Sequence, residues 1–286
     1  MQSVPLRNKQ GLTEEEFLAQ YKPSAYPRPS VTVDMLLFTI ENNALKMLLI
    51  RRQNHPYMHA WALPGGFVGI DESIDQAVYR ELAEETNITQ DVYFEQLYTF
   101  GEVQRDPRMR VISCAYISLT PSSNIKNTRA GDDAEDAAWF TVELTKAYRK
   151  PQENCYELTL TSEEKNVRIK YTVKERAQGM RKTYDLSLSD ASTDRLAFDH
   201  AHVVHMALQR LKNKVSYTAI AFSLLPKQFT LGQLQKVYEV LLGEKLDRAN
   251  FRKAVRHMVR QVGQQTTKSA RRSVMLFEYD PLSHTD

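Results

Sequence analysis

Four charged residues between positions 80 and 85 are spaced as R-E-x-x-E-E and could bind a metal ion. On a helix, Glu81, Glu84 and Glu85 would project from one face, because positions i, i+3 and i+4 lie close together. Three such carboxylates repel one another unless a cation lies between them, and their hard oxygen atoms favour Mg²⁺ or Mn²⁺. Arg80 could pair with Glu84 on the next turn, or with Glu72 in the preceding loop, and hold the ligands in place.

The surrounding stretch from Gly66 to Ile88, GFVGIDESIDQAVYRELAEETNI, resembles the Nudix box. The pattern of that box is G-x5-E-x7-R-E-U-x-E-E-x-G-U, where U is a bulky aliphatic residue. Its charged positions are all present, and only the second glycine differs, since Asn87 stands there. Asn is the best substitute for glycine where a helix ends with a positive φ. The alternative, a surface helix with solvated acids, does not explain so many matches in one window.

The resemblance implies a reaction, in which a divalent cation assists the attack of water on a diphosphate linked to a nucleoside. It also implies roles for single residues. Glu81 and Glu85 would be the primary metal ligands, Glu84 a further ligand or a residue that positions the water, and the Gly66 carbonyl an additional ligand. Arg80 and Glu72 complete the catalytic set. The general base stays open among four acids: Glu102, Asp132, Asp133 and Glu135.

Three further segments resemble the ADP-ribose branch of Nudix proteins, whose members carry a C-terminal DNA-binding domain. They are WALPGGFV, RDPRMRVISCAYI, and DDAEDAAWF followed later by LAFDHA. This resemblance implies ADP-ribose or a related NAD or sugar nucleotide as the ligand. Arginines are expected to pair with its phosphates and an aromatic ring to stack on its base. The candidates are Arg51, Arg52, Arg105 and Arg108 for the phosphates, and Trp61, Phe67 or Tyr116 for the base.

The apolar patterns indicate an α/β fold. Alternating runs predict strands at 31–41 and 45–51, with Asn42 and Asn43 between them, and at 94–103, 110–119 and 136–142. With the metal-binding helix at 73–86, they fit the α/β/α sandwich that the resemblance implies. Three more alternating runs, at 156–161, 167–174 and 182–188, suggest a small antiparallel β-insert, to which we assign no function.

From residue 195 onward the periodicity becomes helical and the charge changes sign. This part holds 15 lysines and arginines against 7 acids, a balance of +8, so the upstream part of this +3 chain carries −5. A basic half joined to an acidic half suggests a second, polyanionic partner. Helices are expected at 197–212 and 230–242. A third, RANFRKAVRHMVRQ, is expected to follow the N-cap residue Asp247, with the strand VMLFEY at 274–279 as a wing.

This order of elements predicts a winged helix-turn-helix domain that binds double-stranded DNA. The segment IAFSLLPKQFTLGQLQKVYEVLLGEKLDRANFRK also resembles the C-terminal domain of Nudix-related transcriptional regulators. Readers of this type usually pair two recognition helices, so we expect a homodimer. The predicted DNA-binding residues are Arg248, Arg252, Lys253, Arg256, Arg271 and Arg272. The predicted organisation is an N-terminal helical arm (1–30), a Nudix domain (31–144), a β-rich insert (145–194) and a winged-helix DNA-binding domain (195–286).

Two functions remain open. The first is a Mg²⁺-dependent pyrophosphohydrolase that acts on ADP-ribose or a related nucleoside diphosphate derivative and is fused to a DNA-binding domain. The second is a transcriptional regulator that senses ADP-ribose or an NAD metabolite without hydrolysing it. The three retained glutamates of the box favour the first.

Other features indicate less specific properties. Three histidines, at 200, 202 and 205, are spaced like metal ligands, but such histidines are more often polar-face or capping residues. No apolar run approaches the roughly 18 residues that span a bilayer, so no membrane partner is expected. Cys114 and Cys155 lack metal-type spacing and fit a reducing cytoplasm.

Overall fold

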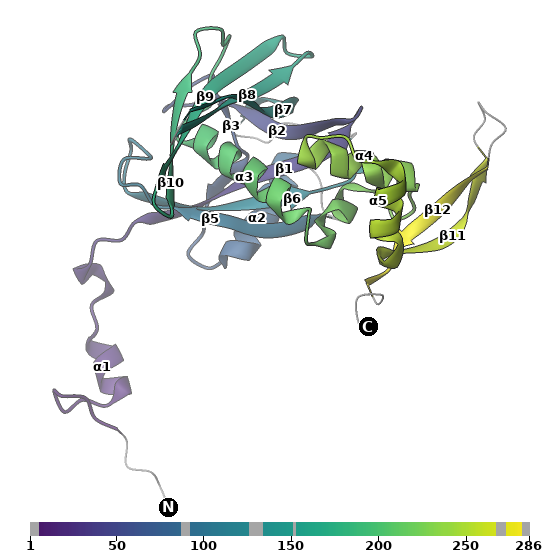
Figure 1. Cartoon of the computed structure of the whole chain (residues 1–286). Coiled ribbons are helices and arrows are strands. Elements are labelled where there is room, and N and C mark those ends of the chain that lie inside the picture. Colours follow the sequence, from purple (N-terminus) through teal and green to yellow (C-terminus); the bar gives the residue numbers. More distant parts are fainter. Residues whose placement is uncertain (1–5, 87–91, 126–133, 151–152, 267–272, 282–286) are drawn as a thin grey trace, which may run out of the picture.

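The computed structural model of the chain describes residues 6–86, 92–125, 134–150, 153–266 and 273–281. A large mixed sheet has one helix on each face, and further helices and a two-stranded sheet follow it (Figure 1). The helices are α1 (Glu14–Gln20), α2 (Ile74–Thr86), α3 (His200–Lys214), α4 (Leu231–Leu242) and α5 (Arg248–Val255), with short 3-10 helices η1 (Pro23–Ala25), η2 (Ser122–Asn124), η3 (Ala219–Leu224) and η4 (Arg256–Met258). The strands are β1 (Ser30–Glu41), β2 (Ala44–Arg52), β3 (Trp61–Ala62), β4 (Gly65–Phe67), β5 (Tyr93–Phe100), β6 (Val111–Leu119), β7 (Ala134–Lys150), β8 (Glu153–Ser162), β9 (Val167–Gln178), β10 (Arg181–Leu188), β11 (Val259–Thr266) and β12 (Ser273–Tyr279).

The large sheet runs in the order β10-β9-β8-β7-β2-β1-β6-β5, with β3 paired to β2 and β4 to β1. Strands β1 and β6 are parallel, which joins segments 30–38 and 111–119 in the middle of the sheet. The hairpin expected at 31–51 is confirmed as β1 and β2, and Asn42 and Asn43 turn the chain with φ of 51° and 60°. The three runs of the β-insert form β8, β9 and β10, which continue the same sheet from β7.

The two faces of β1 show why the sheet is covered on both sides. Successive side chains of a strand point to opposite faces. Val33, Met35 and Leu37 pack against the apolar side of α2. Leu36 and Phe38 point the other way and belong to the cluster that includes Val203, Val204 and Ala207 of α3. The α/β/α sandwich expected from the sequence is therefore confirmed.

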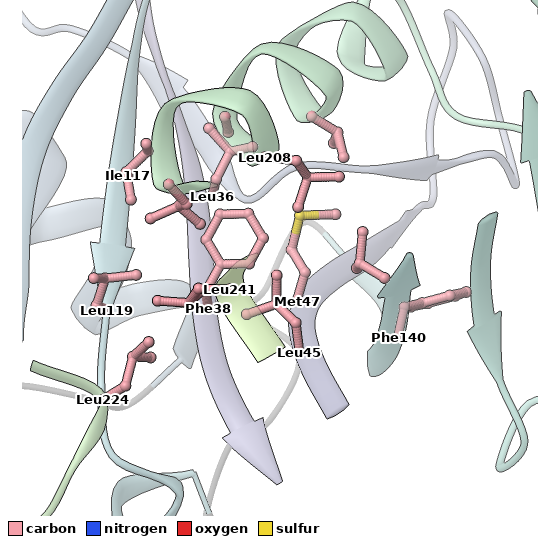
Figure 2. Close-up of a cluster of buried hydrophobic side chains, with 14 of the residues drawn as sticks. Leu36, Phe38, Leu45, Met47, Ile117, Leu119, Phe140, Leu208, Leu224 and Leu241 are labelled. Carbon is pink, nitrogen blue, oxygen red and sulfur yellow. The ribbon is translucent and has the colours of Figure 1, made fainter. Parts of the chain in front are cut away.

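The apolar core does not end with the sandwich. Figure 2 shows Leu224 of η3 and Leu241 of α4 in the same cluster as Phe38 and Leu119 of the central strands. Helix α3 lies between these parts, and its residues Leu208 and Leu211 belong to the cluster as well. The C-terminal helices are thus packed onto the sandwich rather than tethered to it by an open linker. The predicted boundary at 194/195 places α3 with the C-terminal domain, although α3 covers the sheet.

The C-terminal part has the expected helix-turn-helix and wing. Helix α4 begins at a capping box of Thr230 and Gln233 and ends at Gly243, whose φ is 73°. Helix α5 begins at Asp247, which accepts hydrogen bonds from two amides of its first turn. The expected fourteen-residue third helix is wrong in length. It ends at Val255, and Val259–Thr266 form the strand that pairs with β12 to make the wing.

The N-terminal arm has the short helix predicted from its sequence. Thr13 and Glu16 form a capping box, and no residue of α1 is buried. Figure 1 shows this arm extending away from the sandwich. Within the described residues, no helix is long and apolar enough to cross a membrane. Both cysteines are free and buried.

Candidate functional site

Arg80 organises the acids of the Nudix-like box on α2. Its guanidinium donates two hydrogen bonds to Glu72, of 3.1 and 2.7 Å, and one each to Glu81 at 2.7 Å and Glu84 at 3.1 Å. Its hydrogen bonds, together with one from the Gly69 amide, lower the pKa of Glu72 to about 2. Arg80 is expected from the sequence to pair with Glu84 or with Glu72, and it pairs with both, so that Glu72 ties the middle of α2 to the loop before the helix.

The absence of a side chain at Gly66 leaves room for the Glu81 carboxylate. A Cβ atom built on Gly66 would come within 2.1 Å of the Glu81 carboxylate, far inside any van der Waals contact. Glu81 and Glu85 are both buried, each only 7% exposed. Burial raises the pKa of Glu81, and the hydrogen bond from Arg80 opposes this effect. The box thus brings two buried carboxylates and a glycine backbone to one place.

This donor set fits a divalent cation. The carboxylates of Glu81, Glu84 and Glu85 line one cavity together with Gly66, and a buried carboxylate needs a compensating cation. Arg80 supplies one positive charge to two of the three acids. Among the described residues, no three His, Cys, Asp or Glu side chains are already grouped as a metal cage.

The cavity has a volume of about 630 Å³, and Arg52 and Arg108 line it together with the acids. Arg52 donates from Nε to the Pro56 carbonyl at 2.8 Å. Arg108 is held by Asp106, to which it donates two side-chain hydrogen bonds of 3.0 and 2.7 Å. Burial lowers the pKa of Arg52, and the charge of Arg108 lowers it further. Two converging guanidinium groups in one cavity make a site for an anion.

Three of the predicted ligand-binding residues do not line the cavity. Arg51 does not line the cavity: its Nε donates to the His59 carbonyl and lies 3.9 Å from Glu135. Trp61 is 1% exposed and packs edge-on against Phe140, so it offers no face to a base. Tyr116 donates to Asp75 beneath α2 and does not line the cavity, whereas Phe67 does.

Arg105 lines the cavity, but its guanidinium is already paired. It donates two hydrogen bonds to Asp199, of 3.0 and 2.8 Å, and one to Asp34 at 3.2 Å. His200 lies beside this group, 3.7 Å from Asp34, and its Nδ1 accepts a hydrogen bond from the Leu63 amide. Burial lowers the pKa of His200, which favours the neutral ring. Arg105 therefore links Asp199 to Asp34 in the cavity wall, and its predicted phosphate contact stays a prediction.

The sequence reasoning missed Phe198, which lies in the wall between the two cavity arginines. The guanidinium carbon of Arg52 is 4.9 Å from its ring centroid and that of Arg108 is 5.9 Å away. Tyr57 packs on the same ring at 4.7 Å. The backbone of Phe198 has a φ of 49°, a conformation that a bulky residue rarely adopts. Neither feature has a local sequence signal.

The histidines and the proposed bases lie elsewhere than expected. His200 and His205 are buried between α3 and the sheet instead of on a polar face, and none of the three histidines belongs to a metal-type group among the described residues. Glu102 and Glu135 do not line the cavity. Asn87, Ile88, Asp132 and Asp133 fall outside the described residues.

The candidate nucleic-acid interface is the exposed side of α5 and η4. The exposed residues there include Arg248, Arg252, Lys253 and Arg256, and none of them forms an ion pair within the described part of the chain. Phe251 and Val255, on the opposite side of the helix, are buried. Arg271 and Arg272, predicted for the wing, lie outside the described residues.

The turn between α4 and α5 depends on Glu239, which sequence reasoning also missed. Its carboxylate accepts hydrogen bonds from the Leu246 amide at 3.2 Å and from Lys236 at 2.8 Å. Gln235 bonds both Glu239 and the Leu246 carbonyl. This group fixes the orientation of α5 against α4, and so the direction in which the basic side of α5 faces.

Comparison with known proteins identifies both halves of the chain. Residues 29–158 match the model of the NUDIX domain, and residues 221–279 match the NrtR DNA-binding winged helix domain. The "ADPR responsive transcriptional repressor NtrR" of Acinetobacter baylyi is 34% identical over 84% of this chain and 78% of that protein. An ADP-ribose pyrophosphatase of Methanocaldococcus jannaschii is 40% identical over 41% of this chain and 64% of that protein. The structure of Shewanella oneidensis NrtR complexed with a 27mer DNA has a TM-score of 0.62 at 29% identity and covers 88% of this chain and 94% of that one.

Proposed function

Since this chain belongs to the family of Nudix-related transcriptional regulators that carry an NrtR-type winged helix, we propose that it is a DNA-binding regulator whose Nudix domain recognises ADP-ribose. One observation carries the proposal. The acids of the box line one cavity together with Arg52 and Arg108, in a chain that also presents an exposed basic helix.

The chemistry of the cavity suits a nucleoside diphosphate. Arg52 and Arg108 provide the positive charge that a diphosphate needs, and the acids of α2 lie opposite them. Phe67 lines the cavity and is 43% exposed, with the guanidinium carbon of Arg108 5.5 Å from its ring centroid, and it is the aromatic ring proposed to contact the base. The relative from Acinetobacter baylyi is described as responsive to ADPR, which supports ADP-ribose over other members of this class.

DNA binding is assigned to the start of α5. In helix-turn-helix proteins the N-terminal residues of the second helix reach base edges in the major groove. Arg248 and Arg252 hold this position, whereas Lys253 and Arg256 lie further along and are assigned to phosphates. The relative from Shewanella oneidensis has been solved with DNA, which supports this use of the domain. We further propose a homodimer, because two recognition helices read a pseudo-palindromic site more tightly than one.

Hydrolysis of ADP-ribose is the second candidate, favoured by the complete set of box acids. Glu81 and Glu85 would be the primary ligands of Mg²⁺ or Mn²⁺, with Glu84 and the Gly66 carbonyl as further ligands. When bound, the metal would neutralise phosphate charge and acidify the attacking water. Arg80 orients the acids, and Arg52 and Arg108 bind the phosphates. The described part of the cavity does not identify the general base.

One experiment separates binding from hydrolysis. Wild-type protein is titrated with ADP-ribose by calorimetry, and AMP release is then followed with Mg²⁺ and with Mn²⁺. Glu81→Gln keeps the shape of the side chain but removes one ligand charge, and should lower any hydrolysis by about a hundredfold or more. Glu143→Gln, on the exposed side of β7, is the matched control. Binding without AMP release supports a sensor, whereas failure to bind ADP-ribose would refute the proposed ligand.

A further inference from the structure

The wall of the ligand cavity and the start of α3 are built from the same short segment. Ala197 donates from its amide to the Trp61 carbonyl at 2.8 Å, next to β3. Phe198 lies between Arg52 and Arg108. Asp199 is the N-cap residue of α3, yet its carboxylate makes no capping bond and pairs with Arg105 instead. The segment is thus joined both to the cavity and to the helix, because the Asp199 carbonyl accepts hydrogen bonds from the amides of His202 and Val203 in the first turn of α3.

Helix α3 connects this segment to the winged helix. It begins one residue after Asp199 and runs to Lys214, whose ammonium group contacts Glu95 and Tyr93 at the end of the sheet. Leu208 and Leu211 share an apolar cluster with Leu241 of α4. A shift at the first turn of α3 would therefore reach α4, and with it the turn that orients α5.

The positive φ of Phe198 locates the place where such a shift can begin. A bulky residue keeps a φ of 49° only where its surroundings hold it there. Those surroundings are the Trp61 carbonyl, the Arg105–Asp199 pair, and the Tyr57 ring and two guanidinium groups that lie on the Phe198 ring. Among them, the guanidinium groups are the ones that a ligand phosphate would also contact.

We propose that Phe198 is a positioning residue, which holds Arg52 and Arg108 for the diphosphate of the ligand and couples an occupied cavity to the start of α3. This inference rests on the proposed function and adds the regulation of the same site. A diphosphate that pairs with the two arginines alters their contacts with the ring, and the strained segment then passes the change to α3. Phe198 makes no contact with the reacting atoms in this account.

The test compares Phe198→Leu with Phe198→Tyr in the full-length protein. Leu removes the aromatic face at similar volume, whereas Tyr retains it. ADP-ribose affinity is measured by calorimetry, and affinity for a duplex selected from a random pool is measured with and without saturating ADP-ribose. Phe198→Leu should bind ADP-ribose about 5- to 30-fold more weakly, as expected from the loss of two cation–π contacts. In Phe198→Leu, the ratio of the DNA affinity without ADP-ribose to the DNA affinity with saturating ADP-ribose should fall toward one. Phe198→Tyr should keep both this ratio and the ADP-ribose affinity within about twofold of wild type.

The ratio of DNA affinities separates coupling from a merely structural role, because at saturating ADP-ribose a loss of ligand affinity alone does not change this ratio. A Leu variant that is folded and retains wild-type ADP-ribose affinity, or the full wild-type ratio, would overturn the proposal. If wild type itself does not bind ADP-ribose, the proposed function fails. The same variants titrated with inorganic diphosphate then test whether Phe198 positions the arginines: equal affinities of the Leu variant and wild type would overturn that part too.

Discussion

Replacing Arg52 by Ala should weaken ADP-ribose binding strongly, because this arginine provides one half of the anion site. A hydrogen bond to a charged group contributes about 1.5–3 kcal/mol, which corresponds to roughly 10- to 150-fold in affinity. Arg108 remains in the variant. It is relieved there of the repulsion between the two guanidinium groups, which in the wild type lowers the pKa of Arg52. We therefore expect the lower part of that range, about 10- to 50-fold.

The neighbouring residue provides the matched control. Arg51 has the same side chain on the same strand, but it points away from the cavity toward the His59 carbonyl and Glu135. Arg51→Ala should leave the dissociation constant for ADP-ribose within about twofold of wild type. Both variants would be titrated calorimetrically at one salt concentration after thermal unfolding has shown that they are folded. Equal losses in the two variants, or no loss in Arg52→Ala, would refute the assignment of the anion site.

Four further predictions concern the box, the turn, the DNA and the assembly. Gly66→Ala should displace the Glu81 carboxylate and so weaken Mn²⁺ binding, because the added Cβ would lie 2.1 Å from a carboxylate oxygen. Calorimetry measures this affinity, and an Mn²⁺ affinity equal to that of wild type would contradict the prediction. The pKa of Glu239 is lowered from 4.5 to about 2, chiefly by the hydrogen bond from Lys236. Its carboxylate therefore stabilises the fold fully above pH 4.5, and this stabilisation is lost as the pH falls toward 2. Glu239→Gln should reduce this part of the dependence of the unfolding temperature on pH, and a pH profile identical to that of wild type would argue against it. Arg256→Ala should lower the slope of log affinity for DNA against log salt by about one unit, and a slope equal to that of wild type would remove this residue from the phosphate contacts. Light scattering should find a particle of twice the 33.0 kDa chain mass, whereas a monomer alone, with or without DNA, would refute the homodimer.

The sequence predicts the sandwich well because its signals are local. The spacing of Glu81, Glu84 and Glu85 predicts a shared helix face, and the alternation along β1 predicts a strand with two covered faces. Both follow from the geometry of the backbone, and the structure confirms them. The end of α5 could not be predicted in this way. Residues 256–261 have helical periodicity, but Val259 pairs with Tyr279 of β12, and this pairing ends the helix.

The ligand site is only partly predictable for the same reason. Strand alternation alone cannot assign Arg51 and Arg52 to a face, because the pairing of β2 with β7 shifts register between them, and only the assembled sheet shows that Arg52 lines the cavity. A tryptophan such as Trp61 can either fill an apolar core or stack on a nucleotide base. Its packing against Phe140 shows that it fills the core. Phe198 acquires its place from β2, from the 105–108 loop and from its own positive φ, none of which its neighbours in sequence specify.

The most direct test of the central claim is the affinity of the full-length protein for DNA as ADP-ribose is added. Fluorescence anisotropy of a labelled duplex selected from a random pool would be measured without divalent metal, so that no ligand is hydrolysed, with AMP and ribose 5-phosphate as controls. A ligand shifts the equilibrium only if it binds the DNA-competent and the released form with different affinity. We predict that saturating ADP-ribose weakens DNA binding by roughly 5-fold or more, the usual lower range of coupling between two sites, and that the two controls do not. DNA affinity that stays constant while calorimetry shows ADP-ribose bound would contradict the account.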